Sequence, residues 1–224
     1  MSTWLLPGLD ATGLLWRPLL DVLGHEGVRA VSYPDPVRRY DDVIAHLGAP
    51  EPGTVLVAES FSGPAAIRIA HAHRERVRAV VLVASFANGP RGLLSLGPLM
   101  GAALQVRPPA LAIRALMVGM DADPALVGMV RDAIGRVPAA TLAARLRESA
   151  ATDVRRELAA LPMPVVWLRA TRDRLVPERV TRDAIAARPG LDVRSLDGPH
   201  LLAQARPREV AEIIRSATDR SSRP

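Results

Sequence analysis

The sequence predicts an α/β fold in which a mostly parallel, six-stranded sheet carries helices on both faces. Short apolar runs recur along the chain, and most of them are followed by a helical pattern. The run at 77–84 is almost continuously apolar, as a central strand covered on both sides should be. The predicted strands are residues 3–6, 29–33, 54–58, 77–84, 164–170 and 191–196, and the predicted helices are residues 14–23, 40–47, 63–73, 177–187 and 206–218.

The alternation of strands and helices stops once, between residues 88 and 152. This stretch contains no strand-like run, and its helical segments lie near residues 93–104, 109–120, 124–136 and 138–150. A crossover between parallel strands needs only one helix. We therefore interpret residues 88–152 as a helical lid over the carboxyl ends of the strands, inserted in a core of residues 1–87 and 153–224. The alternative is that these helices merely thicken the core.

Composition excludes several classes of protein. The 224 residues suit one domain, and the absence of cysteine excludes a disulfide scaffold, a thiolate zinc site and a cysteine nucleophile. The five histidines show no metal-ligand spacing, so we expect neither a metal nor a cofactor. The 29 basic residues are all arginine, and they are scattered rather than gathered on one face with aromatic residues, which argues against nucleic-acid binding. A mild positive field suits an acidic substrate or partner better.

No segment of the sequence indicates targeting or membrane insertion. The longest uncharged stretch, residues 92–106, is shorter than the roughly 20 residues that span a bilayer. We therefore expect a cytoplasmic protein with no membrane partner.

The segment Ala58-Glu59-Ser60-Phe61-Ser62-Gly63 contains a candidate nucleophile. It lies where a predicted strand passes into a predicted helix, and a serine at such a turn has a strained backbone and an exposed hydroxyl. The residues two before and two after the serine must be small, and Ala58 and Ser62 are small, although the usual motif has glycine at both places. Taken alone, Ser60 could equally be an ordinary helix N-cap.

Two later loops supply the partners that a nucleophilic serine needs. Asp173 follows the strand at 164–170, and His200 follows the strand at 191–196. The order serine, acid, histidine is the order expected on such a sheet, and all three residues follow carboxyl ends of parallel strands. The structural alternatives are an Asp173 paired with a neighbouring arginine and a His200 with no chemical role. Asp183 and Asp197 are rival acids.

An acyl-transfer site also needs donors for the oxyanion. One donor should be the backbone N–H of Phe61, which follows the nucleophile. The second should be the N–H of Leu9, in the loop after the first strand, where Gly8 permits a sharp turn. This loop lacks the glycine spacing of a dinucleotide site.

Together these motifs resemble the α/β-hydrolase superfamily, over residues 3–217. The Pro-Gly-Leu-Asp loop, the Ala-Glu-Ser-Phe-Ser-Gly turn, Arg-Asp-Arg-Leu-Val-Pro and Gly-Pro-His are similar to segments of its small serine esterases. Two features depart from the pattern. Pro7-Gly8 replaces the usual His-Gly, and the antiparallel hairpin that opens most members is absent, which leaves six parallel strands in the order 2-1-3-4-5-6.

The resemblance implies a serine carboxylesterase with Ser60 as nucleophile, His200 as base and Asp173 as the acid that orients it. Because the nucleophile is a serine, the activities of superfamily members with an aspartate nucleophile are excluded. Thioesterase, lactonase and acyltransferase activities remain open. An alternative function is that of a binding protein, which has the hydrolase fold and binds a ligand without catalysis. For a small-molecule ester or acyl substrate we expect contacts from Trp16, Met100, Met117, Leu175 and Leu201.

The resemblance also suggests a partner. Relatives that demethylate a pimeloyl group on an acyl carrier protein dock this acidic carrier on a basic lid. The residues that motivate this hypothesis are Arg107, Arg114, Arg131, Arg136, Arg145 and Arg147. The alternative is that these arginines are simply solvated.

Overall fold

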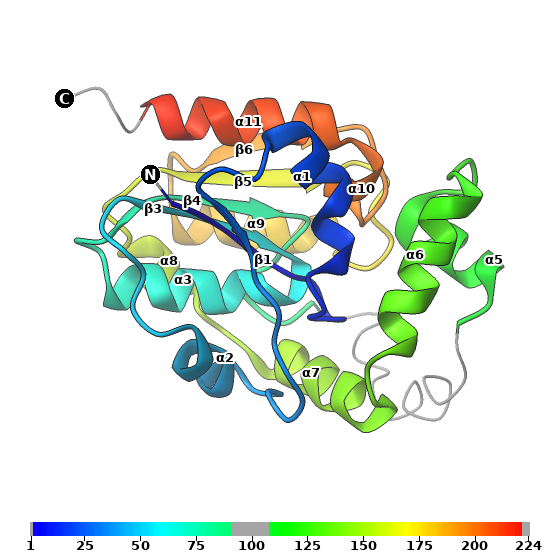
Figure 1. Ribbon diagram of the computed structural model, residues 1–224. Helices are drawn as coiled ribbons and strands as arrows, with labels where there is room; N and C mark the ends of the chain where they lie inside the picture. Colours follow the sequence, from blue (N-terminus) through cyan, green and yellow to red (C-terminus); the bar gives the residue numbers. More distant parts are fainter. Residues whose placement is uncertain (1, 91–107, 221–224) are drawn as a thin grey trace.

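The six strands form one parallel sheet in the order β2-β1-β3-β4-β5-β6 (Figure 1). The structure, a computed structural model, describes residues 2–90 and 108–220, and the side chains as far as residue 218. The strands are β1 (Thr3–Leu6), β2 (Val28–Ala30), β3 (Thr54–Glu59), β4 (Val77–Val83), β5 (Val165–Ala170) and β6 (Asp192–Leu196). The predicted order and the parallel direction of the strands are confirmed.

The second strand is shorter than predicted and begins one residue earlier. The prediction was residues 29–33, whereas β2 ends at Ala30. Val31 still donates its N–H to the Leu5 carbonyl (2.9 Å), but the Tyr33 N–H turns to the Ala11 carbonyl (2.8 Å). The apolar residues after Ala30 therefore hold the loop that follows β1 instead of extending the sheet.

Alternate residues of the central strands enter two separate cores. In β3, Leu56 and Ala58 belong to one buried cluster, and Val55 and Val57 belong to the other. This is the consequence of side chains that point to opposite faces of a strand. Both faces are buried, which explains why the sequence of these strands is continuously apolar.

Helices cover both faces of the sheet (Figure 1). On one face lie α1 (Arg17–Leu23) and α11 (Pro207–Arg220), which supply Leu19 and Ile214 to the core there. The other face carries α2 (Tyr40–Leu47), α3 (Gly63–Ala72), α8 (Arg155–Ala159) and α9 (Glu178–Ala187). Short turns η1 (Leu14–Trp16), η2 (Ser60–Ser62) and α10 (Leu202–Ala205) adjoin the strand ends.

In the described part of the connection between β4 and β5, helices occupy the regions that the sequence predicts, 109–120, 124–136 and 138–150. It contains α5 (Ala110–Ile113), the π-helical turn η4 (Arg114–Val118), α6 (Pro124–Gly135) and α7 (Ala139–Ala151), drawn in green beside one end of the sheet in Figure 1. We call α5, η4, α6 and α7 the intervening helices. The helix predicted at 93–104 lies outside the described residues. That this segment works as a lid stays a prediction.

No helix within the described ranges combines the length and the apolar character needed to cross a membrane.

The start of α3 lies against the loop that follows β4. A Cβ atom added at Gly63 would lie 1.8 Å from Ser85 Oγ and 2.9 Å from Ser85 Cβ. The same Ser85 hydroxyl donates a hydrogen bond of 2.7 Å to the Ser60 carbonyl. Only glycine at position 63 permits this approach without displacing Ser85.

The close approach at Gly63 can be tested by adding one methyl group. We expect Gly63→Ala to lower the free energy of unfolding by about 1–3 kcal/mol, because Ser85 must move from its hydrogen bond. Gly128→Ala in α6 is the matched control: its new Cβ meets nothing within 4 Å, and we expect a gain of about 0.5–1 kcal/mol. Urea unfolding measures both variants. A Gly63→Ala variant as stable as the unmodified protein would contradict the packing described.

Candidate active site

Ser60 occupies a strained turn between a strand and a helix. The strand β3 ends at Glu59, α3 begins at Gly63, and Ser60 between them has a φ of 46°. A non-glycine residue in this left-handed region costs about 1–3 kcal/mol, which the surrounding packing must supply. The turn leaves Ser60 9% exposed, with its hydroxyl at the wall of a cavity.

The side chains of Ser60, His200 and Asp173 form a continuous hydrogen-bonded chain. His200 Nε2 lies 3.0 Å from Ser60 Oγ, and His200 Nδ1 lies 2.8 Å from Asp173 Oδ2. In the tautomer with its proton on Nδ1, the ring donates to the carboxylate and leaves Nε2 free to accept from the serine hydroxyl. The second oxygen of Asp173 accepts the N–H groups of Leu175 (2.8 Å) and Val176 (2.9 Å). The carboxylate is therefore fixed on both sides.

The rival acids are engaged elsewhere. Asp183 accepts a hydrogen bond from Asn88 (2.8 Å) and pairs with Arg179 (3.3 Å). Asp197 pairs with Arg172 at 3.1 Å. Neither carboxylate is within hydrogen-bonding distance of His200 among the contacts of the described residues. The ion pairs there also give Asp173 no arginine partner, contrary to the structural alternative.

The expected oxyanion donors belong to residues that line the same cavity as Ser60. Leu9 and Phe61 are both in its wall. Within the described parts of the chain, the Leu9 N–H donates to no backbone or side-chain acceptor. It is therefore available to a ligand.

A second carboxyl group lies beside the nucleophile. Glu59, 1% exposed, accepts one hydrogen bond of 3.0 Å, from Gln204 Nε2, and burial raises its pKa to about 7. The nearby charges of Asp10 and Asp173 also raise the pKa, whereas His200 and the bond from Gln204 lower it. Sequence reasoning passed over Glu59. The available signal was a carboxylate at the end of a strand that is otherwise apolar.

The charges around His200 determine its basicity. Burial lowers the pKa of His200, but the charge of Asp173 and its hydrogen bond, together with the charge of Glu59, more than offset this. The net effect raises the pKa above the usual value of 6.5. The imidazolium form is therefore favoured more than in free histidine.

The cavity at Ser60 has a volume of about 300 Å³ and an almost wholly apolar wall. The sheet-side loops contribute Ser60, His200 and Phe86, and the intervening helices contribute apolar residues such as Ile113 and Leu142. Asp10 and Ser149 are its other polar residues. This composition suits the hydrocarbon part of an acyl group.

Three of the five residues expected to contact substrate line this cavity, namely Met117, Leu175 and Leu201. Met100 lies outside the described residues. Trp16 is not part of the described wall, because its ring is buried in the core cluster that contains Leu19. Its neighbour Leu15 lines the cavity instead, since consecutive residues of the turn η1 point in different directions.

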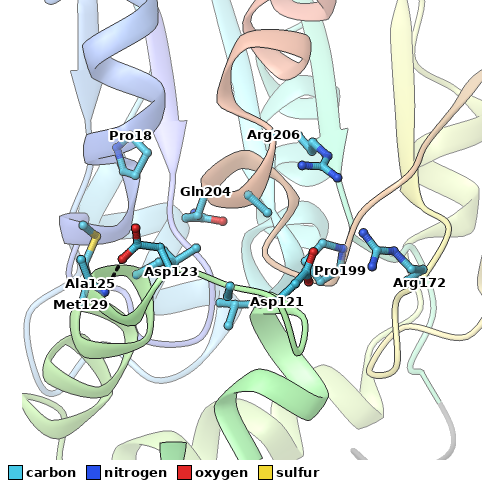
Figure 2. A pocket seen from close by; sticks show the side chains of 13 residues that line it. Pro18, Asp121, Asp123, Ala125, Met129, Arg172, Pro199, Gln204 and Arg206 are labelled. Carbon is cyan, nitrogen blue, oxygen red and sulfur yellow. Dashed lines mark hydrogen bonds between the residues drawn. The ribbon is translucent and has the colours of Figure 1, made fainter. Parts of the chain in front are cut away.

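A second cavity, of about 390 Å³, adjoins the His200 loop but does not contain Ser60. Its wall is more polar, with Asp121, Asp123, Arg172 and Arg206 among the side chains drawn in Figure 2. Asp123 accepts the Ala125 N–H at 2.7 Å and so caps α6, as the dashed line shows. Of these two cavities, only the apolar one therefore has Ser60 in its wall.

The arginines expected to dock a carrier protein do not form one surface set. Arg145 is 1% exposed, so its inclusion is wrong, and Arg114 donates to the carbonyls of Met120 (3.0 Å) and Ala122 (2.6 Å). Arg107 lies outside the described residues. The remaining three are exposed and form no ion pair within the described ranges: Arg131, Arg136 and Arg147. A separate observation concerns metals: in the described ranges, no three histidine, aspartate or glutamate side chains lie close enough together to hold a metal ion.

Solved structures with this architecture come from several kinds of enzyme. An esterase from Exiguobacterium antarcticum has a TM-score of 0.82 at 14% identity, with 98% of this chain and 92% of that chain covered. An enol-lactonase from Burkholderia xenovorans has a TM-score of 0.81 at 17% identity, with 97% and 90% covered. A putative non-heme bromoperoxidase from Mycobacterium tuberculosis has a TM-score of 0.76 at 17% identity, with 98% and 92% covered. At these identities the likeness shows the fold alone.

Comparison with curated proteins gives no match. The model of the alpha/beta hydrolase family matches residues 1–213, which is nearly the whole chain. The sheet order, the turn at Ser60 and this match agree, and the chain belongs to the alpha/beta hydrolase family.

Proposed function

We propose that the protein is a serine hydrolase that cleaves carboxylic esters through an acyl-enzyme intermediate. The observation that carries the proposal is the hydrogen-bonded chain from Ser60 through His200 to Asp173 at the wall of an apolar cavity. A hydroxyl becomes a useful nucleophile when an imidazole removes its proton. The carboxylate holds the imidazole in the required tautomer and stabilises its cation.

The reaction has two halves that use the same groups. In the first, Ser60 Oγ attacks the ester carbonyl while His200 Nε2 accepts its proton, and the N–H groups of Leu9 and Phe61 bind the oxyanion. The ester C–O bond then breaks, and the leaving alkoxide takes the proton from His200. In the second half, water attacks the acyl-enzyme with His200 again as base. The C–Oγ bond breaks, Ser60 recovers its proton and the carboxylic acid leaves.

The apolar cavity supports an ester with a hydrocarbon acyl group as the substrate. Met117, Leu175 and Leu201 contact this acyl group in the proposed complex, and the intervening helices form its lid. Thioesters, lactones and acyl transfer to another acceptor would use the same three side chains, and the choice among them depends on the leaving group and on access of water. We propose that the protein hydrolyses oxygen esters. We also propose that it works in the cytoplasm, as we expect from the sequence.

A fluorophosphonate probe separates an enzyme from a binding protein with the same fold. We expect one covalent adduct at Ser60 by mass spectrometry and hydrolysis of p-nitrophenyl esters. Ser60→Ala should remove the adduct and lower kcat by about 10⁶-fold, and Asp173→Asn should lower it by about 10⁴-fold because the tautomer is lost. The exposed Ser195→Ala is the control and should keep both activities. Folded protein that takes up no probe and cleaves none of the esters would show a binding protein.

The pH dependence of ester cleavage should reflect the charges around His200. Only the neutral imidazole accepts a proton, so kcat/KM should rise with pH and have its midpoint above 6.5, because Asp173 and Glu59 raise the pKa of His200. Glu59→Gln keeps a side chain that can bond Gln204 but removes the negative charge, so the midpoint should move to lower pH. Glu51→Gln, at an exposed site, should leave it in place. An unchanged midpoint in Glu59→Gln would mean that Glu59 does not act on His200.

A second candidate substrate is an ester carried by an acidic acyl carrier protein. It is favoured by three exposed arginines that have no ion-pair partner in the described ranges, one on α6, one directly after it and one on α7. Reversing Arg131, Arg136 and Arg147 together to glutamate should then slow cleavage of the carrier-linked ester at least tenfold and leave p-nitrophenyl ester cleavage as it was. Equal rates on the carrier-linked ester before and after charge reversal would remove this candidate.

A further inference from the structure

Arg145 is a buried cation in a helix next to the cavity. It lies in α7, its side chain is 1% exposed, and no carboxylate in the described ranges lies within ion-pair distance of it. Its guanidinium instead donates to backbone carbonyls: Nη1 to Leu9 (3.0 Å) and Asp10 (3.3 Å), and Nε and Nη2 to Val37 (3.1 and 2.8 Å). A planar fork of donors on a buried stem can fix several acceptors at once.

These bonds complete the restraint of the loop that follows β1. The Pro7 carbonyl accepts from the Ser62 hydroxyl, and the Gly8 carbonyl accepts from the Ala11 N–H at 3.1 Å. The Ala11 carbonyl accepts from Tyr33 at 2.8 Å. The two carbonyls between them, of Leu9 and Asp10, are held by Arg145.

The Leu9 N–H is the group whose direction this restraint determines. It lies between the restrained carbonyls of Gly8 and Leu9, and it has no acceptor among the described residues. Without Arg145, the carbonyls of Leu9 and Asp10 accept no described hydrogen bond, and the two peptides that follow the Leu9 N–H lose the bonds that hold them in place. Phe61, the residue of the other expected donor, also lies near the cation, with 6.0 Å between Arg145 Cζ and the ring centroid.

We propose that Arg145 is a positioning residue of the oxyanion hole, which holds the Leu9 N–H in the direction that the developing negative charge requires. The inference rests on the proposed ester hydrolysis. The intervening helices, whose apolar residues form part of the cavity wall, would then also take part in the chemistry through Arg145. Arg145 does not touch the substrate in this proposal, because the carbonyls occupy its donors.

If Arg145 positions the oxyanion donor, its replacement should lower kcat and leave KM nearly unchanged. A purely structural role predicts no such selective loss. Arg145→Met keeps the apolar stem, and we expect it to lower kcat for p-nitrophenyl butyrate by about 10–100-fold, since a misdirected donor loses much of its effect. KM should change less than about threefold, because the oxyanion contact forms in the transition state. The midpoint of the pH profile should stay in place, because Arg145 is not among the groups that shift the pKa of His200.

Arg188 provides a matched control. Its guanidinium also holds three carbonyls, those of Leu158, Leu161 and Met163, and none of these residues lines the apolar cavity. Both Arg145→Met and Arg188→Met should lower the stability to urea, because each leaves carbonyls without their donor. Only Arg145→Met should lower kcat. If Arg145→Met and Arg188→Met have the same kcat, the positioning role is overturned.

Two further measurements keep the proposal testable if Arg145→Met does not fold. Arg145→Lys keeps the charge and the apolar stem but not the planar fork that spans the three carbonyls, and should lose kcat by about tenfold. Arg145→Ala should regain kcat at millimolar methylguanidinium but not at equal sodium chloride. A fully active Arg145→Lys, or no rescue of a folded Arg145→Ala, would count against the role. Failure of the proposed function is distinguishable, because the unmodified protein would then cleave no ester.

Discussion

The left-handed backbone of Ser60 is the constraint on which the arrangement of the site depends. Strand β3 must turn into α3 within three residues, and the turn leaves no room for large neighbours. Gly63 lies against Ser85, and Ser85 in turn holds the Ser60 carbonyl at 2.7 Å. At position 62 the common glycine is replaced by serine, and the hydroxyl bonds both the Pro7 carbonyl and Tyr33. The replacement thereby ties the nucleophile turn to the loop of the expected oxyanion donor, a contact that glycine cannot make.

Two carboxyl groups influence the same imidazole through different environments. Asp173 accepts two backbone N–H groups and the ring of His200, so hydrogen bonds satisfy its charge. Glu59 is buried in the sheet with one amide donor, and burial brings its pKa to about 7. The ionisation of Glu59 therefore affects His200 near neutral pH.

The strands were predictable from local signals, and the resemblance to the α/β-hydrolase superfamily implied their order. Apolar runs that alternate with helical patterns were sufficient to predict six parallel strands, and the order implied by the resemblance is the observed one. Ser60, Asp173 and His200 were predictable as neighbours for the same reason, since each follows the carboxyl end of a parallel strand. The end of β2 was not, because a tertiary contact of Tyr33 with the Ala11 carbonyl decides it.

Side-chain direction was the part that sequence reasoning could not supply. Trp16 and Leu15 are adjacent, and only the geometry of the turn η1 assigns the second to the cavity and the first to the core. Arg145 looks in sequence like any other arginine of a charged helix. Its burial depends on carbonyls that are more than 100 residues away along the chain.

The contacts of α7 connect specificity with reactivity. A fold of this class supports many reactions, so the reaction must be selected by the groups around the nucleophile. Here one helix supplies Leu142 and Leu146 to the apolar wall and Arg145 to the loop of the Leu9 N–H. A displacement of α7 that admits a larger acyl group would also move the cation that holds this loop. In the proposed mechanism, accommodation of the substrate and alignment of the oxyanion donor are therefore coupled, since both depend on the same turns of α7.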